Sequence, residues 1–245
     1  MPDSVAVRAA RTRPRNDPRQ YDDLAAEWWK PNGMFAMLHW IAEARAGLVP
    51  PARAPGAVLV DLGCGGGLLA PHAARLGYRH VGVDLGERAL QVAREHGVLP
   101  VRADVARLPL PDAVADVVSA GEILEHVPDL PAAVAEACRV LRPGGTLVLD
   151  TLARTRRARL VAVTVGERVP GGAPKGIHDP ALFVDRRALV EQCARHGVRL
   201  TLRGFRPSAG GLLRWLLRRD RPVPMVPTRS TAVLFQGYGV KEEVR

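Results

Sequence analysis

The 245-residue sequence has few cysteines and no long apolar run. Its three cysteines, Cys64, Cys138 and Cys193, are odd in number and far apart, which argues against a disulfide framework or a thiolate zinc site. No uncharged apolar stretch reaches about 18 residues, so we expect no membrane-spanning helix. The first residues include arginines but not the apolar segment that a secretion signal needs. We therefore expect a protein of the reducing cytoplasm.

Lysine is scarce as well, with only Lys30, Lys175 and Lys241 in a chain whose net charge is +10. The excess positive charge is local, because residues 152–221 hold 16 basic and five acidic side chains. A basic region of this kind attracts nucleic acid or an anionic membrane. The bias toward arginine is also what a GC-rich genome produces, so charge alone does not identify the partner.

The hydrophobic pattern divides the chain into segments. Residues 1–16 are rich in arginine and proline and predict a disordered basic tail. Residues 17–55 predict a helical cap, with Asp17 as N-cap and Pro18 at the first helical position. Residues 56–151 alternate short apolar runs with amphipathic helices, the pattern of a doubly wound parallel sheet. Residues 152–180 and 205–228 read as basic inserts, and two late strands suggest an antiparallel hairpin at the sheet edge.

A glycine-dense turn, Asp61-Leu-Gly-Cys-Gly-Gly-Gly67, follows the first apolar run. Glycines at this point let the backbone approach a ligand closely, where open α/β sheets bind nucleotide-like cofactors. Leu68 stands where a dinucleotide fingerprint needs its third glycine. Asp84 and Asp104 end the next two runs, where carboxylates can accept hydrogen bonds from ribose hydroxyls and from an exocyclic amine. A cofactor other than NAD is therefore favoured, although such residues also serve as helix caps.

The motifs DLGCGGG, VGVDLG, RADVARLPLP, EHVPD and LRPGGTLVL, in this order, resemble the class I S-adenosylmethionine-dependent methyltransferases. That resemblance implies a Rossmann-like, seven-stranded sheet whose last strand is antiparallel. It also implies S-adenosyl-L-methionine as cofactor. The contacts it implies are Asp61, Gly63, Cys64, Gly65 and Gly67 at the methionine end, Asp84 and Leu85 at the ribose, and Asp104 and Val105 at the adenine.

Three further segments, AEWWKPNGMFAMLHWIAEAR, GEILEHVPD and PKGIHDPALFVDRRAL, are similar to the ubiquinone biosynthesis O-methyltransferases. This closer resemblance covers about Tyr21 to Lys241 and implies methyl transfer to a phenolic hydroxyl on a polyprenylated ring. It adds Arg45 and Gly121 to the cofactor site. It also implies a divalent-cation site, Mg²⁺ or Zn²⁺, made by Glu122, Glu125 and His126. Candidate substrate contacts are Trp28, Trp29, Lys175 and His178.

The stretch AGEILEHVPD leaves three interpretations open. If it is helical, Glu122, Glu125 and His126 lie on one face and offer an O/O/N ligand set that activates the phenol. Without a metal, His126 can act as general base, because its ordinary pKa is close to neutral pH. In the third interpretation these side chains only shape the rim of the pocket. His178 is a second candidate base, or a hydrogen-bonded loop residue.

The two inserts combine arginines with apolar residues. In GGLLRWLLRRDRPVP, leucines and Trp215 alternate with Arg214, Arg218 and Arg219, which suits an interfacial helix on anionic lipid. We expect a basic C-terminal lid that draws an apolar-tailed substrate from the membrane surface. The alternative is a helix whose leucines pack on the core and whose arginines face water.

Several other functions are disfavoured. Amino-directed nucleic-acid methyltransferases carry an Asn/Asp-Pro-Pro-aromatic motif where this chain reads VVSAGEIL, so no nucleic-acid partner is expected. A catalytically silent cofactor-binding module would be expected to lose Glu122, Glu125 and His126. The remaining alternative is a methyltransferase for a secondary-metabolite phenol or amine, and the oligomeric state stays open.

Overall fold

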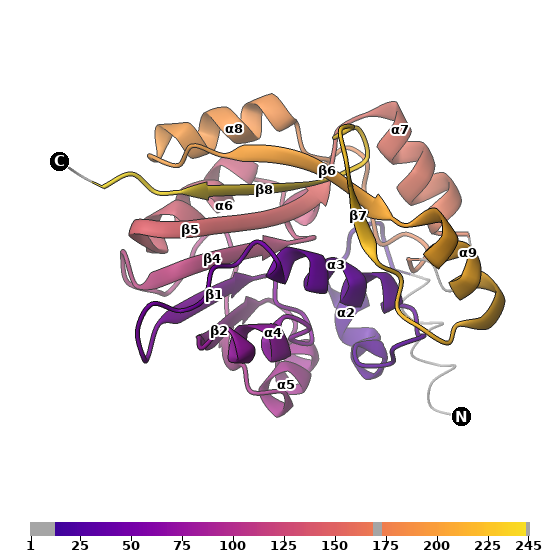
Figure 1. Cartoon of the computed structure of the whole chain (residues 1–245), viewed down its shortest axis with the longest axis horizontal. Coiled ribbons are helices and arrows are strands. Elements are labelled where there is room, and N and C mark those ends of the chain that lie inside the picture. Colours follow the sequence, from indigo (N-terminus) through magenta and orange to yellow (C-terminus); the bar gives the residue numbers. More distant parts are fainter. Residues whose placement is uncertain (1–12, 169–172, 244–245) are drawn as a thin grey trace.

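The structure is a computed structural model that describes residues 13–168 and 173–243. In that part of the chain, eight strands form a single mixed sheet with the order β3-β2-β1-β4-β5-β8-β6-β7 (Figure 1). The first five strands are parallel: β1 (Val58–Leu62), β2 (Arg79–Asp84), β3 (Leu99–Arg102), β4 (Ala115–Gly121) and β5 (Leu141–Leu152). The last three are β6 (Thr201–Pro207), β7 (Met225–Thr228) and β8 (Leu234–Val240).

Helices precede and connect these strands. In chain order they are α2 (Arg19–Asp23), the 3-10 helix η1 (Ala25–Glu27), α3 (Ala36–Ala46), α4 (Ala70–Arg75), α5 (Glu87–Glu95), the 3-10 helix η2 (Leu124–His126), α6 (Leu130–Val140), α7 (Arg156–Ala158), the π-helix η3 (Arg159–Gly166), α8 (Arg186–Arg195) and α9 (Ala209–Arg218). Across residues 13–168 and 173–243, no helix is long and apolar enough to span a bilayer.

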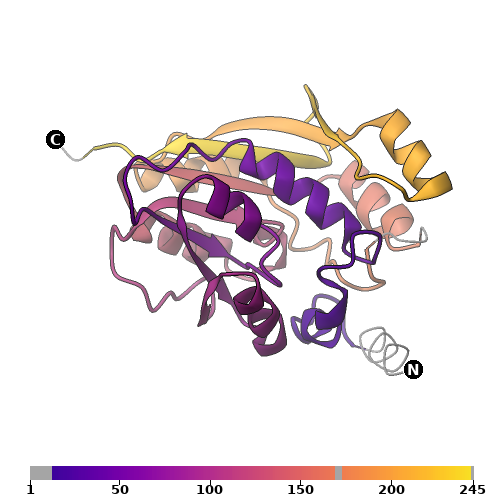
Figure 2. The same cartoon turned by 60° about the horizontal axis from the view of Figure 1, so that its bottom comes forward.

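Alternating side chains of the central strands build a core on each face of the sheet. Val60 and Val118 pack with α6 and α8 on one face, whereas Leu59 and Val117 pack with α4 and the end of α3 on the other. All four side chains are buried. Apolar residues on both faces are what a parallel sheet covered by helices on both sides requires. Figure 2 shows α3 running along one face of this sheet.

The Rossmann-like α/β prediction with N-terminal helices is confirmed, and the last strand, β8, runs antiparallel to β5 as expected. Two details are corrected. The described sheet has eight strands instead of seven, because β7 pairs with β6 and adds an edge strand. The hairpin expected at the edge is internal, because β8 lies between β5 and β6. Pro227 fits the edge position of β7, where a proline costs no ladder hydrogen bond.

The N-terminal segment differs from the expectation in two ways. The helix expected from Asp17 to the tryptophan pair is split into α2 and η1, and Leu24, buried between them, ends the first. Residues 1–12 of the expected tail lie outside the described residues. Arg13 pairs with Asp23 and Arg15 pairs with Glu167, so ordered structure begins before Asp17. Residues 169–172 of the first insert also lie outside the described part.

The tryptophan pair explains the split helix. A Cβ atom at Gly65 or Gly66 would lie 2.3 Å or 2.4 Å from the Trp28 ring, so the glycine turn provides the surface on which Trp28 packs. Trp29 donates from Nε1 to the Gly66 carbonyl at 2.8 Å and stacks on His96 of the segment after α5. The two side chains therefore fasten the N-terminal segment to the glycine turn.

We predict that Gly66→Ala destabilises the protein by about 1–3 kcal/mol, because the new methyl group collides with Trp28 and overpacks the interface. The measurement is the free energy of unfolding in urea. Gly210→Ala, in α9, is the matched control, because its Cβ meets nothing within 4 Å and alanine is the better helix former. Equal stability of Gly66→Ala and the wild type would contradict this packing account.

Candidate active site

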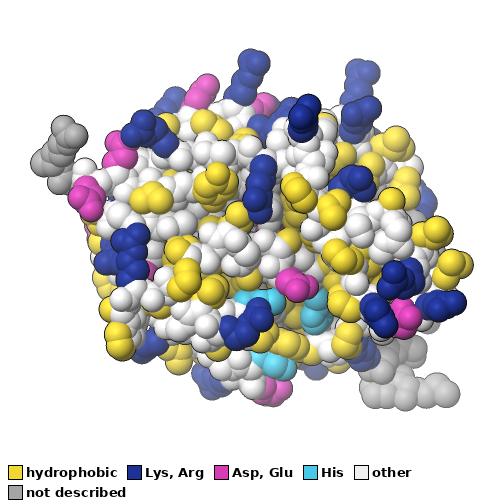
Figure 3. Space-filling view, viewed as in Figure 1, with side chains coloured by type: hydrophobic (Ala, Val, Ile, Leu, Met, Phe, Trp, Pro, Cys, Tyr) yellow, Lys and Arg dark blue, Asp and Glu magenta, His cyan; other side chains and the backbone are white. Residues whose placement is uncertain are grey.

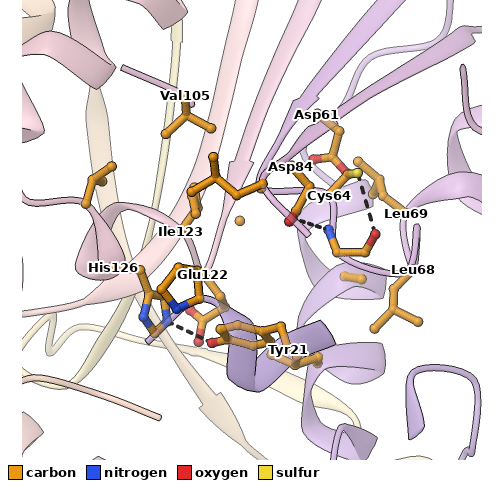
Figure 4. A pocket seen from close by; sticks show the side chains of 18 of the residues that line it. Tyr21, Asp61, Cys64, Leu68, Leu69, Asp84, Val105, Glu122, Ile123 and His126 are labelled. Carbon is orange, nitrogen blue, oxygen red and sulfur yellow. Dashed lines mark hydrogen bonds between the residues drawn. The ribbon is translucent and has the colours of Figure 1, made fainter. Parts of the chain in front are cut away.

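A cavity of about 350 Å³ opens at the carboxyl ends of the parallel strands. Open α/β sheets bind ligands at this edge. Its walls come from the glycine turn after β1, the ends of β2 and β4, the loop after β3 and the N-terminal segment (Figure 4). The expected cofactor residues that line it are Arg45, Asp61, Gly63, Cys64, Gly65, Asp84, Leu85, Asp104, Val105 and Gly121.

The glycine turn lines the cavity with backbone at Gly63 and Gly65. Gly63 and Gly65 have φ angles of 66° and 50°, which side-chain-bearing residues rarely adopt. Gly67 also has a positive φ, but it does not line the cavity; a Cβ there would meet Val98 and Ala93, so it allows close packing against α5. Cys64 is buried, and burial raises the pKa of its thiol, so it faces the cavity as a neutral group.

Acidic side chains stand at the ends of the first two strands. Asp84 accepts hydrogen bonds from the backbone N–H groups of Gly65 and Gly86 at 2.9 Å and 2.8 Å. These bonds connect the glycine turn to the turn before α5. Burial nevertheless raises the pKa of Asp84 above its usual value. Asp61 lies 3.4 Å from His80; burial alone would raise its pKa, but the nearby imidazole lowers it below the usual value.

A buried ion pair forms the wall beside β4. Arg45 of α3 donates from Nη1 to both carboxylate oxygens of Asp150 at 2.8 Å and 2.9 Å. A Cβ at Gly121 would lie 1.6 Å from this Nη1 atom, so only glycine leaves room for the guanidinium. The Nε atom of Arg45 is buried with no hydrogen-bond partner in the structure. An unpaired buried donor on the cavity wall fits an anionic group such as the carboxylate of S-adenosylmethionine.

The stretch after β4 does not form the helix that would align its charged side chains. Glu122 has a left-handed backbone, with a φ of 49°, and only Leu124–His126 forms a 3-10 turn. Glu122 and His126 line the cavity. Glu125 is fully buried and accepts a hydrogen bond from the Thr151 hydroxyl at 2.7 Å.

The geometry therefore does not support the predicted cation site. No group of three histidine, cysteine, aspartate or glutamate side chains within the described residues is placed to hold a metal ion. Glu122 and Glu125 each have a buried oxygen without a partner, which would suit a cation. Both nitrogens of His126, however, contact other side chains, namely Asn16 and Tyr21. The O/O/N set is not assembled, and we derive no step through a metal.

Burial determines the charges of this stretch. It raises the pKa of Glu125 to about 7, and burial together with the charge of Glu125 raises the pKa of Glu122 well above its usual value. Burial, with a smaller contribution from His178, lowers the pKa of His126 to about 3. At neutral pH the imidazole of His126 is consequently uncharged, with a lone pair able to accept a hydrogen bond.

Two residues that sequence analysis missed contact His126. The Tyr21 hydroxyl lies 3.1 Å from Nε2, a hydrogen bond drawn as a dashed line in Figure 4, and Asn16 contacts Nδ1. Asn16 lies in the segment predicted to be a disordered tail, and Tyr21 marks only the start of the family resemblance. The one available signal was their position beside Asp17-Pro18, at the start of a helix that covers the cavity.

Only two of the four expected substrate contacts line the cavity. Trp28 and His178 line the cavity, and the His178 and His126 rings are stacked with centroids 5.6 Å apart. Trp29 instead contacts Gly66 and His96 and does not line the cavity. Lys175 is exposed and is not among the residues that line the cavity.

We predict that the contribution of Glu125 to the free energy of unfolding falls as the pH rises from about 4.5 to about 7, while the lowered pKa of His126 makes the contribution of that residue rise over much of the same range. Burial raises the folded-state pKa of Glu125 to about 7, so the unfolded chain loses this proton at a lower pH than the folded chain does. Between these two pKa values, rising pH therefore favours the unfolded state. The contribution of Glu125 is about 3 kcal/mol. Glu125→Gln should remove it, whereas Glu95→Gln, at an exposed position, should keep the wild-type dependence. Urea unfolding across this pH range is the measurement, and an unchanged dependence in Glu125→Gln would contradict it.

Comparison with known proteins agrees with the fold. Residues 60–149 match the family model described as a methyltransferase domain. The ubiquinone biosynthesis O-methyltransferase of Cupriavidus pinatubonensis is 38% identical over 208 residues, which cover 79% of this chain and 83% of that protein. The enzyme of the same name from Thiobacillus denitrificans is 39% identical over 189 residues, covering 73% and 81%.

Among solved structures, a SAM-dependent methyltransferase from Thermotoga maritima superposes with a TM-score of 0.65 at 19% identity. The match covers 91% of this chain and 98% of that one, and it supports the fold alone. The identity and coverage of the sequence relatives go further than the fold. The chain is an S-adenosylmethionine-dependent O-methyltransferase and belongs to the ubiquinone biosynthesis O-methyltransferase family.

Proposed function

We propose that the chain methylates a phenolic, catechol-type hydroxyl of a polyprenylated ubiquinone precursor, with His126 as the group that accepts the phenol's proton. The names of the relatives support the pathway. The observation that carries the role of His126 is its uncharged imidazole on the cavity wall, with Nε2 facing a phenolic hydroxyl, that of Tyr21. This nitrogen already lies within hydrogen-bond distance of the kind of group that the substrate would offer.

The proposed cofactor arrangement follows the cavity wall. The glycine turn and Arg45 hold the methionine end, Asp84 and Leu85 hold the ribose, and Asp104 with Val105 holds the adenine. When bound, S-adenosylmethionine supplies a methyl group on a positively charged sulfur. Trp28, which packs on the glycine turn, would exclude water from that end. Exclusion of water strengthens the electrostatic interactions of the reacting groups.

The chemical step needs a proton acceptor. A phenol has a pKa of about 10 and is mostly protonated at neutral pH. The bound cofactor would supply the methyl carbon to which the phenolic oxygen bonds, and it would keep on its sulfur the electron pair of the carbon–sulfur bond that is broken. The phenolic proton passes to His126 Nε2. Because the pKa of His126 is about 3, it is a weak base, and proton transfer accompanies methyl transfer instead of preceding it.

The substrate's apolar tail suggests a role for the two inserts. On α9, Trp215 is buried against Trp40, whereas Leu213, Leu216 and Leu217 are exposed. These three leucines therefore do not pack on the core, whereas Leu212 packs beside Trp215. On η3, Leu160, Val161 and Val165 are also exposed. Figure 3 shows apolar and basic side chains intermingled on the side of the molecule where Figure 1 places α9.

Exposed leucines next to arginines suit the surface of an anionic membrane. We therefore assign α9 and η3 to peripheral membrane contact at the inner face of the membrane, where a polyprenylated substrate resides. The two inserts act as a lid in this proposal, so that a substrate can enter from the lipid without crossing water.

We predict that His126→Gln lowers kcat about 10²–10⁴-fold, the range expected for removal of a general base. The assay is methyl transfer from S-adenosylmethionine to a short-chain polyprenyl catechol, with a tail-less catechol in parallel. If neither catechol is methylated by the wild type, the proposed substrate class is wrong.

Chelation provides the control for this prediction. Wild-type activity should survive EDTA, because no group of three histidine, cysteine, aspartate or glutamate side chains within the described residues is placed to hold a cation. Activity that disappears with EDTA and returns with Mg²⁺, Mn²⁺ or Zn²⁺ would contradict the base account and restore a metal site at Glu122, Glu125 and His126.

We predict that the protein floats with vesicles containing anionic lipid and that the Leu213→Ser/Leu217→Ser double variant does not. Both leucines are largely exposed on α9, so their loss removes apolar contact area without disturbing the core. Val240→Ser, at an exposed position on β8, is the matched control and should float like the wild type. Wild-type protein that stays in the soluble fraction would contradict membrane contact.

A further inference from the structure

The side chain of Asn16 makes two hydrogen bonds to one residue, His126. Its Nδ2 atom donates to the backbone carbonyl of His126 at 2.9 Å, and its Oδ1 atom contacts the ring nitrogen Nδ1. The two residues are 110 positions apart in the sequence. Asn16 belongs to the segment that crosses over the cavity, and both residues line it.

These two bonds define where the protons lie. A backbone carbonyl can only accept, so the Asn16 atom facing it is the NH₂ group and the atom facing Nδ1 is the amide oxygen. An amide oxygen also only accepts, and so Nδ1 carries the proton of the neutral ring. The other nitrogen, Nε2, is left with its lone pair, which agrees with the hydroxyl of Tyr21 lying 3.1 Å from it.

We infer that Asn16 is a positioning residue for the reaction: it holds His126 as the Nδ1–H tautomer, with the Nε2 lone pair toward the cavity. This inference rests on the proposed role of His126 as proton acceptor. A neutral imidazole with the proton on Nε2 would present a donor to the phenol and could not accept its proton. An oriented imidazole between a fixed acceptor and a reacting hydroxyl is a recurrent arrangement for activating oxygen nucleophiles.

The surroundings keep Asn16 in place. Its backbone N–H donates to the Gly176 carbonyl at 3.0 Å, and its φ of 58° lies in the left-handed region, which asparagine tolerates better than most residues. The preceding residue, Arg15, makes two 3.1 Å hydrogen bonds to Glu167. The segment after β5 therefore supports the residue that orients the imidazole.

Tyr21 has a different part in the same arrangement. Its hydroxyl forms a hydrogen bond with Nε2 in the structure, so a substrate phenol must displace this hydroxyl to reach Nε2. Burial, followed by the charges of Glu125 and Glu122, raises the pKa of Tyr21 well above its usual value, which keeps it a hydrogen-bond donor. The contact shows that a phenolic oxygen fits at this distance from Nε2.

The test uses the full chain labelled with ¹⁵N-histidine. Long-range ¹H–¹⁵N spectra distinguish the two neutral tautomers, and His126→Gln identifies the signals of His126 by their loss. The wild type should show the Nδ1–H tautomer. Asn16→Gly, which tolerates the positive φ, should shift His126 toward Nε2–H, whereas Asn16→Asp, which keeps an acceptor for Nδ1, should retain Nδ1–H. Asn32→Gly, at an exposed asparagine, is the control and should match the wild type.

Kinetics complete the test. Asn16→Gly should lower kcat about 10- to 100-fold while KM for S-adenosylmethionine changes less than about threefold, because orientation of the base is lost and cofactor contacts remain. An Nε2–H tautomer in the wild type, or an Nδ1–H tautomer that persists in Asn16→Gly, would overturn the inference. A tautomer that changes while kcat stays at the wild-type value would support the orienting role of Asn16 and overturn the role of His126 as base.

Discussion

The buried ion pair between Arg45 and Asp150 is the contact on which the geometry of the site depends. It connects α3, on one face of the sheet, to the end of β5. Both side chains are at least nine-tenths buried, so neither charge can be left without the other at small cost. The backbone carbonyl of Asp150 also accepts the Glu122 N–H at 2.9 Å. One residue thus anchors the helix that closes the cavity and the chain segment that leads to His126.

The N-terminal segment then joins the glycine-turn side of the cavity to the side that holds His126. Asp22 accepts hydrogen bonds from the backbone N–H groups of Arg88 and Ala89 and so caps α5 from outside its own sequence. This cap lies beside Asp84, because a Cβ at Gly86 would contact both aspartates. Three anchor points, Asp22, Trp29 and Asn16, hold the segment over both sides. In the proposed reaction, the segment that encloses the phenol is also the one that orients the base.

The parts of the site that sequence could predict are those coded by local patterns. The glycine turn and the carboxylates at the ends of β1 and β2 follow from the alternation of apolar runs and helices, and the cavity is lined by them. The edge strand β7 was missed because its four residues, including Pro227, resemble a turn. Its pairing with β6 is a tertiary contact that no local pattern specifies.

The two features of the site that the sequence did not predict correctly have one physical cause. The grouping of Glu122, Glu125 and His126 assumed helical spacing, but the hydrogen bond from Glu122 N–H to Asp150 accompanies a left-handed backbone that directs these side chains differently. Asn16 could not be found because its partner lies 110 residues away and its neighbours have the composition of a tail. Both contacts depend on how distant segments meet.

The most direct test of the account is the structure of the ternary complex with S-adenosylhomocysteine and a polyprenyl catechol. The account predicts a phenolic oxygen within hydrogen-bond distance of His126 Nε2, in the place that the Tyr21 hydroxyl occupies, and facing the sulfur of the cofactor product. A catechol oxygen near that sulfur but away from His126, or bound through a cation to Glu122 and Glu125, would contradict it.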